Sequence, residues 1–304
     1  MKLDVIGLGA LNVDKLFLVE QIAKEDEESS IIDFEEACGG SAANTIVGLA
    51  RLGLKTGYIG KIARDREGQL LLSDFKKEKV DIRGIVAAGN GRSGVVMGFV
   101  DKKGERAMYI DPGVNNSIKL EEINLQYANN TAFVHVSSFV GEKAFQVQKK
   151  LIASLSSDVK MSLDPGDLYA DKGLTVLRPI IERCHVIFPN EHELKLLTNE
   201  DYEKGAETLL NEGVHIVAVK LGPKGCYVTN GREKHLMPRY PVKVVDTTGA
   251  GDAFCAGFLY GLIKNKSLER CGKLGNFVAS KCIEKVGART GLPYSAELPK
   301  NLQC

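Results

Sequence analysis

The sequence predicts an α/β protein built on a mostly parallel sheet with helices on both faces. Short runs rich in β-branched residues alternate along the chain with longer segments of helical periodicity. The chain has 304 residues, enough for one large core, and its 44% of hydrophobic residues is ordinary for a globular protein. We therefore expect a single domain over residues 1–304, with a small additional sheet.

The alternation is visible throughout the chain, without internal repeats. Buried strands are predicted at residues 5–6, 58–60, 133–136, 161–163, 186–188 and 216–219. Amphipathic helices are predicted at residues 42–52, 67–78, 142–155 and 203–211. Ligands of such sheets bind outside the carboxyl ends of the strands, so functional residues are expected in the loops that follow them.

Two segments interrupt the alternation, residues 12–37 and 92–112, and both are typical of extended chain. In the second, the runs 94–100 and 106–110 are joined by a turn at 101–104, as in a hairpin. We expect the two segments to pair as a small separate sheet over the main domain.

Charge and cysteine usage exclude several classes of partner. The net charge of +1 argues against a nucleic-acid partner, and the longest apolar stretch, 253–263, is too short to span a bilayer. Asp4 interrupts the N-terminal apolar run, which makes it a poor signal peptide. The seven cysteines are scattered without a C-x-x-C pair, which favours a reducing compartment. We expect a soluble, cytoplasmic protein that binds neither nucleic acid nor membranes.

The most informative motif is DTTGAGD at residues 246–252, directly before an apolar run. Gly249, Ala250 and Gly251 at a helix start leave N–H groups open to an anion, such as a phosphoryl group in transfer. Asp252 in the first turn could then accept a proton from a substrate hydroxyl. An ordinary helix N-cap preceded by a glycine turn is the alternative.

Two motifs in the first part of the chain are suited to a polyol. Paired glycines at Gly39 and Gly40 allow close approach to a ligand, and Asn44 offers a donor and an acceptor. Asn12 and Asp14 alternate with apolar neighbours, so both point to one side of an extended segment and could bind adjacent hydroxyls. The alternatives are an exposed Asn44 and an ordinary polar strand face.

Two further motifs follow predicted strands. Asn190 and Glu193 supply oxygen atoms of the kind that Mg²⁺ prefers, although favourable helix capping would explain them equally well. Lys220, Gly222 and Gly225 could admit a nucleotide against the backbone, or form a hairpin turn that needs no ligand.

In this order, the motifs resemble the ribokinase (PfkB) family of carbohydrate and nucleoside kinases over nearly the whole chain. Both family signatures are recognisable, in the Gly39-Gly40 region and at 246–252. The resemblance implies a ribokinase-like fold, with a β-sheet lid formed by segments 12–37 and 92–112 that excludes water from the sugar. It also implies a homodimer formed through the lid sheet.

The resemblance implies an ATP-dependent transfer of the γ-phosphate to a hydroxyl of a nucleoside or sugar. Asp252 would be the general base, and the anion hole would consist of Gly249, Ala250 and Gly251. The sugar-contacting positions would be Asn12, Asp14, Gly39, Gly40 and Asn44. The nucleotide would meet Asn190, Lys220, Gly222, Gly225 and, near adenine, Asn276. Glu193 is tied to Mg²⁺, while Asp246 and Thr248, with the segment 285–291, would help to bind a monovalent cation such as K⁺.

The acceptor itself is left open. Ribokinases usually have lysine after the paired glycines, whereas Ser41 stands here, and residues 39–45 look more like broad-specificity nucleoside and sugar kinases. We prefer a nucleoside, with ribose, fructose, inositol and 2-keto-3-deoxygluconate as alternatives. The local pattern of a typical fructose-phosphate kinase is not found, although phosphate-binding arginines could lie in the lid.

Other classes are disfavoured by particular residues. A dinucleotide fingerprint starting at Gly7 would need glycine where Asn12 stands, and the chain has no G-x-x-x-x-G-K-[ST] P-loop. A non-catalytic nucleotide- or sugar-binding protein remains an alternative, against which Asp252 and Glu193 argue.

Overall fold

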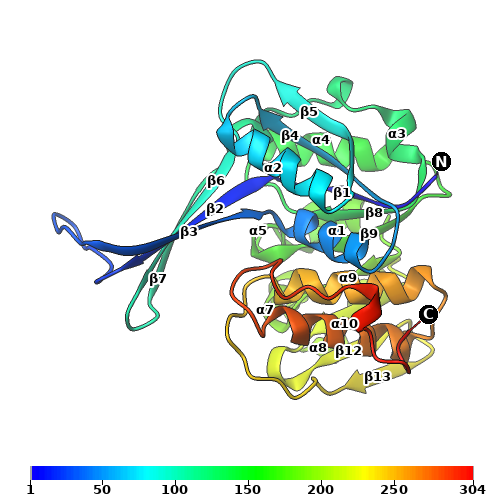
Figure 1. The fold of residues 1–304 in the computed structure, drawn as a ribbon. Coiled ribbons are helices and arrows are strands. Elements are labelled where there is room, and N and C mark those ends of the chain that lie inside the picture. The colour runs from blue at the N-terminus through cyan, green and yellow to red at the C-terminus, as the bar shows by residue number, and fades with distance from the viewer. Residues whose placement is uncertain (1, 304) are drawn as a thin grey trace.

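The computed structural model describes residues 2–303, and its centre is a sheet of nine strands (Figure 1). Their spatial order is β13 (Lys234–Met237), β12 (Cys226–Thr229), β11 (Ile216–Lys220), β10 (Val186–Ile187), β9 (Lys160–Asp164), β8 (Thr131–Ser137), β1 (Leu3–Leu8), β4 (Thr56–Ala63) and β5 (Asp81–Ala88). The seven strands from β11 to β5 pair in parallel, and β12 pairs antiparallel with both of its neighbours, β11 and β13. The predicted mostly parallel sheet is confirmed, and each of the six predicted runs lies in or overlaps one of its strands.

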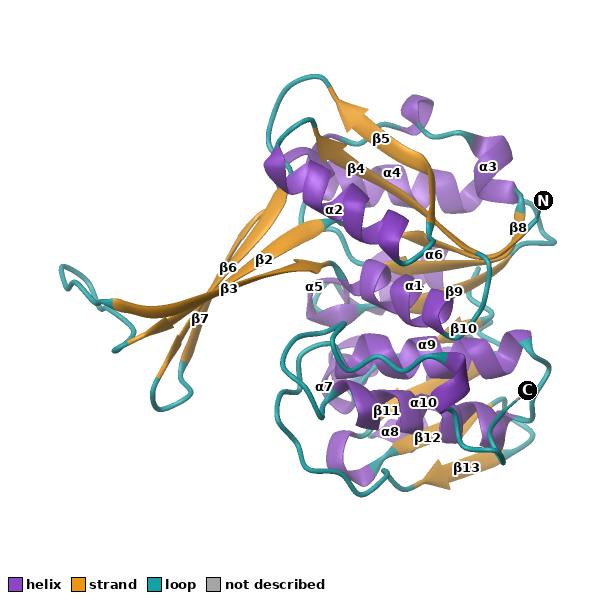
Figure 2. Ribbon diagram, viewed as in Figure 1, coloured by secondary structure: helices purple, strands orange, loops and turns teal. Residues whose placement is uncertain are grey.

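Helices cover both faces of the sheet (Figure 2). One hydrophobic core packs the sheet against α1 (Ser41–Arg51), α2 (Arg66–Lys77), α9 (Ala250–Ile263) and α10 (Leu268–Cys282). The second core packs the other face against α3 (Leu125–Asn129), α4 (Glu142–Ala153), α5 (Gly166–Ala170), α6 (Gly173–Ile181), α7 (Glu191–Thr198) and α8 (Tyr202–Asn211). The parallel strands are therefore buried on both sides, which explains their continuous apolar runs.

The predicted helix boundaries are correct to within two residues, and local chemistry accounts for the differences. α1 begins at Ser41 because Gly40, with φ of 102°, turns the chain out of β3 in a conformation that favours glycine. α2 begins at Arg66 because the side chain of Asp65 caps it by accepting a hydrogen bond from the amide of Gly68.

A second sheet of four strands projects from the body (Figure 1). Its order is β3 (Ile31–Gly39), β2 (Asn12–Val19), β6 (Gly94–Asp101) and β7 (Arg106–Asp111). The pairs β2–β3 and β6–β7 are antiparallel, and β2–β6 is parallel. The separate sheet and its hairpin at 101–104 are as predicted, except that residues 20–30 form a loop between strands.

The topology gathers distant residues at one edge of the large sheet. β9, β10 and β11 are adjacent and parallel, so their carboxyl ends lie side by side. Asp164 ends β9, Asn190 follows β10 and forms a bridge with Lys220, and Lys220 ends β11. α9 packs on the same part of the sheet, which brings its N-terminus into reach of these side chains.

None of the described cysteines forms a disulfide and five of them are buried, while Cys304 lies outside the described residues. Within residues 2–303, no helix has both the length and the apolar character needed to cross a membrane.

Candidate functional site

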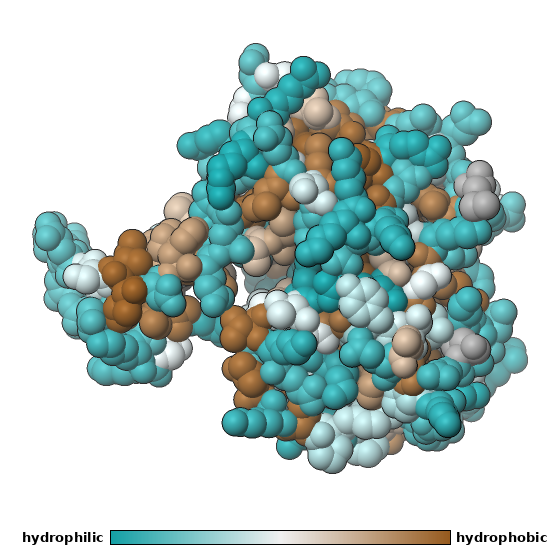
Figure 3. All heavy atoms as spheres, in the orientation of Figure 1, coloured by the Kyte–Doolittle hydropathy of each residue, from teal (hydrophilic) through white to brown (hydrophobic). Residues whose placement is uncertain are grey.

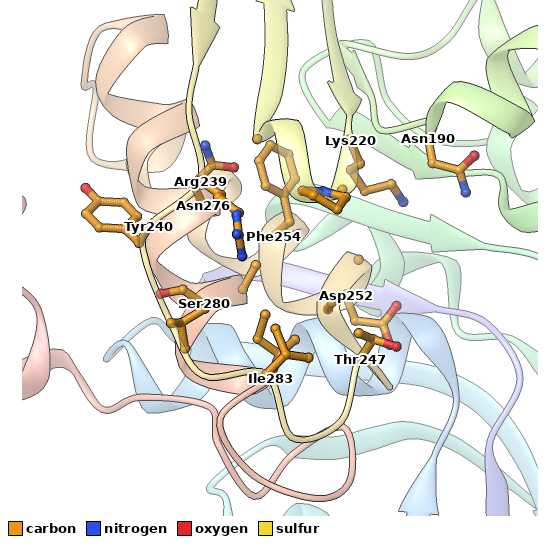
Figure 4. Close-up of a pocket in the computed structure, with 18 of the residues that line it drawn as sticks. Asn190, Lys220, Arg239, Tyr240, Thr247, Asp252, Phe254, Asn276, Ser280 and Ile283 are labelled. Atoms are coloured by element: carbon orange, nitrogen blue, oxygen red, sulfur yellow. The ribbon is translucent and has the colours of Figure 1, made fainter. Parts of the chain in front are cut away.

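A cleft of about 480 Å³ opens at the carboxyl ends of β9 to β11 and the N-terminus of α9 (Figure 4). Lys220, Asn190 and Asp252 lie toward one end of this cleft, and Arg239, Tyr240 and Asn276 lie toward the other. The cleft therefore has a charged end at the strand termini and an end lined mainly by larger side chains.

Asp252 occupies the first turn of α9, at the charged end of the cleft. Its Oδ1 accepts a hydrogen bond from Ser41 Oγ at 2.7 Å, and its Oδ2 accepts one from Asn44 Nδ2 at 2.8 Å. Burial raises the pKa of Asp252 to about 6, and the nearby charge of Asp164 also raises it, while the two hydrogen bonds oppose the rise. Above pH 6 the carboxylate is thus mostly ionised and able to accept a proton.

The loop before Asp252 has the backbone conformation expected of an anion hole. Gly249 is the N-cap of α9 with φ of 74°, and no side chain caps the helix. A Cβ on Gly249 would lie 2.5 Å from Cβ of Ala288, so both conformation and space require glycine. The amide of Ala250 donates to the carbonyl of Thr247 at 3.2 Å, so the first-turn amides left to the cleft are those of Gly251 and Asp252, together with the positive end of the dipole of this 14-residue helix.

Asp246 and Thr248 stabilise this loop through side-chain hydrogen bonds. Asp246 Oδ1 accepts hydrogen bonds from the amide and hydroxyl of Thr248, and Oδ2 accepts one from the amide of Gly287 at 2.8 Å. Partial burial would raise the pKa of Asp246, but the hydrogen bonds from Gly287 and Thr248 outweigh burial and lower it. Asp246 therefore ties the loop to the segment after α10.

The residues predicted for a polyol lie where β2, β3 and α1 meet. A Cβ on Gly39 would lie 2.1 Å from Oδ2 of Asp14, so glycine is needed for the carboxylate to occupy this place. Burial raises the pKa of Asp14 to about 6; the Arg289 charge lowers it and the Asp252 charge raises it. Asn12 Oδ1 accepts a hydrogen bond from Asn115 at 3.1 Å. Asn12 and Asp14 share one face of β2, as predicted.

Asn44 is 6% exposed, so the alternative of an exposed helix residue is wrong. It joins the two family signatures, because it donates to Asp252 across a sequence separation of 208 residues. Its Oδ1 accepts a hydrogen bond from Nε of Arg289 at 2.8 Å, and Arg289 also donates to the carbonyl of Gly39 at 3.2 Å and pairs with Asp74.

Sequence reasoning missed Arg289 as an individual site residue. It lies in the 285–291 segment that the resemblance connected with a cation, yet its guanidinium positions Asn44 and Gly39. A lone arginine in an irregular segment carried no signal that could have identified this role.

Asn190 and Glu193 form a reciprocal capping box at the start of α7. Asn190 Nδ2 donates to Glu193 Oε1 at 2.7 Å, and the amides of the two residues donate to each other's side chains at 2.8 Å. The capping interpretation is thus confirmed, and it coexists with a position in the cleft. Burial raises the pKa of Glu193 to about 7, against the lowering effect of the Lys220 charge.

Lys220 pairs with Asp164, a residue that sequence reasoning missed. Nζ of Lys220 lies 2.8 Å from Oδ1 of Asp164 and 4.0 Å from Oε2 of Glu193. Oδ2 of Asp164 accepts a hydrogen bond from the thiol of Cys255 at 3.5 Å. Asp164 could have been found, because it directly follows the predicted strand 161–163 at its carboxyl end.

Gly222, Gly225 and Asn276 line the cleft, as expected for a nucleotide-binding surface. Gly225 has φ of 98°, and a Cβ there would lie 2.0 Å from the carbonyl oxygen of Met237. Asn276 donates hydrogen bonds to the carbonyls of Met237 and Pro238 at 3.2 and 3.0 Å, which fixes the chain that leads to Arg239 and Tyr240.

Comparisons with known proteins identify the family of this chain. The model of the pfkB family of carbohydrate kinases matches residues 2–294. An uncharacterized sugar kinase of Archaeoglobus fulgidus is 46% identical over 254 residues, 83% of this chain and 100% of that protein. An ATP-dependent ribose-1-phosphate kinase of Halopiger xanaduensis is 31% identical, with 94% of each chain covered.

Among solved structures, a ribokinase of Arabidopsis thaliana complexed with ribose and ATP superposes with a TM-score of 0.90, at 25% identity and 100% coverage of both chains. The family model covers almost the entire chain, and the folds agree over their full length. The chain therefore belongs to the pfkB family of carbohydrate kinases, and its activity is that of a phosphotransferase with an alcohol group as acceptor.

Proposed function

We propose that the cleft transfers the γ-phosphoryl group of ATP to a hydroxyl of an uncharged sugar or nucleoside, with Asp252 as general base. The observation that carries this proposal is the position of Asp252. It lies buried at the first turn of a helix without a side-chain cap, and residues of both signatures hold it in place.

The reaction follows from the charges. The acceptor oxygen attacks the γ-phosphorus as the bond from phosphorus to the β,γ-bridging oxygen breaks, the hydroxyl proton passes to Asp252, and ADP leaves. Negative charge on the transferring group is stabilised by the N–H groups of the loop Gly249–Gly251 and by the dipole of α9. The helix supplies this charge without reorganisation, because Gly249 and Asp246 fix the loop beforehand.

The acceptor would lie against Asn12, Asp14, Gly39, Gly40 and Asn44. Asp14, ionised above pH 6, can accept hydrogen bonds from two hydroxyls, and glycines leave room beside it. An uncharged acceptor is favoured because the nearest cation, Arg289, already donates to Asn44 and Gly39 and pairs with Asp74. We prefer a nucleoside, with ribose, fructose and inositol as uncharged alternatives. The alternative 2-keto-3-deoxygluconate carries a carboxylate and would need a cation to bind it.

A phosphorylated acceptor is the second candidate, since one relative acts on ribose 1-phosphate. It would require a cation from elsewhere, such as the lid, because Arg289 is engaged. A panel that includes ribose 1-phosphate distinguishes the two.

The nucleotide would lie along Asn190, Lys220, Gly222, Gly225 and Asn276. Its phosphates would be at the charged end of the cleft and its base near Asn276 and Tyr240. ATP as donor follows from the family and from the ATP complex of the Arabidopsis ribokinase.

Mg²⁺ fits this site as an ion that arrives with ATP. The described residues contain no group of three or more histidine, cysteine, aspartate or glutamate side chains that could hold a metal. Mg²⁺ typically keeps several waters and binds one or two carboxylates plus substrate phosphates, and Glu193 could hold its waters. The ion would neutralise phosphate charge.

We also propose a K⁺ requirement near Asp246 and Thr248. The Asp246 carboxylate accepts three hydrogen bonds, two at Oδ1 and one at Oδ2, so Oδ2 keeps a lone pair that could face a monovalent cation. Kinase rates with K⁺ and with a large organic cation at equal ionic strength test this requirement.

The small sheet would act as a lid and as a dimer surface. Val286 and residues of β2 and β3 line a hollow of about 260 Å³ between the sheet and the body, into which the lid could close. The sheet carries a concentration of exposed apolar side chains (Figure 3), namely Leu18, Ile31, Ile32, Phe34, Met97, Met108, Tyr109 and Ile110. Apolar exposure of this kind marks interaction surfaces, and sedimentation of Met108→Asp beside the parent protein tests the dimer.

Release of ADP from Mg-ATP tests the function with nucleosides, ribose, ribose 1-phosphate, fructose, fructose 6-phosphate, inositol and 2-keto-3-deoxygluconate. We expect turnover with an uncharged acceptor, and a loss of at least about a hundredfold in kcat for Asp252→Asn. Turnover of Asp252→Asn within tenfold of the parent would overturn the general-base assignment. ATP binding without turnover on any acceptor would favour the non-catalytic alternative. The absence of disulfides among the described cysteines, most of which are buried, supports our proposal of a cytoplasmic location.

A further inference from the structure

Lys220 is a cation among carboxylates at the charged end of the cleft. Its side chain is 14% exposed, and its ammonium group lies 2.8 Å from Asp164 and 4.0 Å from Glu193. A lysine buried this far would lose its charge without a partner, but the Asp164 carboxylate keeps the pKa of Lys220 above its usual value despite burial. The ammonium is therefore permanently charged at physiological pH.

The end of the Lys220 side chain lies next to the proposed anion hole, the loop of Gly249, Ala250 and Gly251. A Cβ built on Gly251 would lie 3.3 Å from Nζ of Lys220 and 3.7 and 3.9 Å from its Cδ and Cε. The ammonium group and the first-turn amides of α9 therefore border the same space, one residue from Asp252. That space is where the proposed function requires the phosphoryl group to pass.

The composition of the cleft shows why a cation is needed here. Asp164, Glu193 and Asp252 all line it, and three carboxylates would repel a polyphosphate. Among the described lining residues the other cation is Arg239, which lies toward the opposite end (Figure 4). Ser41 is already engaged with Asp252 and carries no charge.

We propose that Lys220 is a catalytic residue whose ammonium group contacts the transferring phosphoryl group, and that Asp164 and Cys255 position it. An ammonium has three N–H donors, so one can bind Asp164 while two remain for phosphate oxygens. The Cys255 thiol donates to the second oxygen of Asp164 and so orients its carboxylate. This inference rests on the proposed kinase function and adds a charged member to the anion hole.

The competing explanation is an ordinary buried ion pair. Removing one partner of such a pair destabilises a protein because the other charge is left unpaired, whereas removing both is often tolerated. A double variant therefore separates the two explanations.

The experiment compares Lys220→Met, Asp164→Asn and the double variant in melting temperature, kcat, and KM for ATP and acceptor. We expect Lys220→Met to lose about 10²- to 10³-fold in kcat, as for other anion-hole donors, with little change in acceptor KM. The double variant should regain the parent melting temperature without regaining kcat. Lys224→Met is the matched control, because Lys224 lies in the turn that follows β11, is 68% exposed and pairs with Glu191. This variant should match the parent.

The positioning role has its own readout. Cys255→Ala should lower kcat severalfold at constant ATP KM, and Cys255→Ser, which keeps a donor for Asp164, should restore it. Equal kcat values for parent, Ala and Ser variants would contradict this part of the proposal.

A near-parent kcat in the double variant would overturn the catalytic role of Lys220. It would show that Lys220 only neutralises the charge of Asp164, which the double variant removes as well. If Lys220→Met does not fold, the double variant and Lys220→Arg still give the comparison, and Lys220→Arg should retain partial activity. Absence of parent turnover on the whole acceptor panel would instead refute the proposed function.

Discussion

Ser41 should control the pH at which this enzyme becomes active. Its hydroxyl donates to Oδ1 of Asp252 at 2.7 Å, and this hydrogen bond favours the ionised carboxylate. In Ser41→Ala the charged form loses this stabilisation, so the pKa of Asp252 should rise above its value of about 6. A base must be ionised to accept a proton, so the acid limb of activity should move to higher pH.

The size of the shift follows from the hydrogen bond. A hydrogen bond to a charged group contributes about 1.5–3 kcal/mol, and 1.36 kcal/mol corresponds to one pKa unit, so the limb should move by about one to two units. With a pKa near 7 to 8, the ionised fraction at pH 7 falls from about 90% to between about 50% and 10%. kcat/KM at pH 7 should thus fall about twofold to tenfold, and at pH 9 it should stay close to the parent value.

The assay is kcat/KM from ADP release between pH 4.5 and 9.5, with the best acceptor of the panel. Thr45→Val is the matched control on the same helix, because Thr45 donates to the main-chain carbonyl of Asp252 rather than to its carboxylate. The control should leave the acid limb in place. An unmoved limb in Ser41→Ala, with kcat/KM lowered equally at every pH, would refute the reasoning.

Two further substitutions probe the loop and its support. Gly249→Ala places a Cβ 2.5 Å from Cβ of Ala288 in a left-handed backbone, so kcat should fall more than about tenfold. Gly53→Ala is the control, because Gly53 also has a positive φ but an added Cβ would meet nothing within 4 Å. This variant should lose only about 1–2 kcal/mol of stability and keep the parent kcat. Equal kcat values for Gly249→Ala and Gly53→Ala would contradict the role of the 249–251 loop. Arg289→Ala leaves Asp74 unpaired and should lower the free energy of unfolding by about 3 kcal/mol, measured by urea denaturation. A loss below about 0.5 kcal/mol would show that the ion pair is effectively solvated.

The sequence by itself determined the fold class and identified several residues that line the cleft. The alternation of strands and helices follows from local periodicity, and residues such as Gly249 and Asp252 are recognisable because glycine geometry and helix starts are local properties. The rule that ligands bind at the carboxyl ends of parallel strands placed Asn190 and Lys220 correctly.

Only the tertiary structure decided which side chains meet. Nothing local pairs Lys220 with Asp164, Asn44 with Asp252 or Arg289 with Asn44, since these pairs are separated by 56, 208 and 245 residues. The raised pKa values of Asp14 and Asp252 likewise arise from burial, which depends on how α1, α9 and the small sheet pack. Periodicity is carried by neighbouring residues, whereas burial and charge pairing depend on three-dimensional packing that no short stretch of sequence contains.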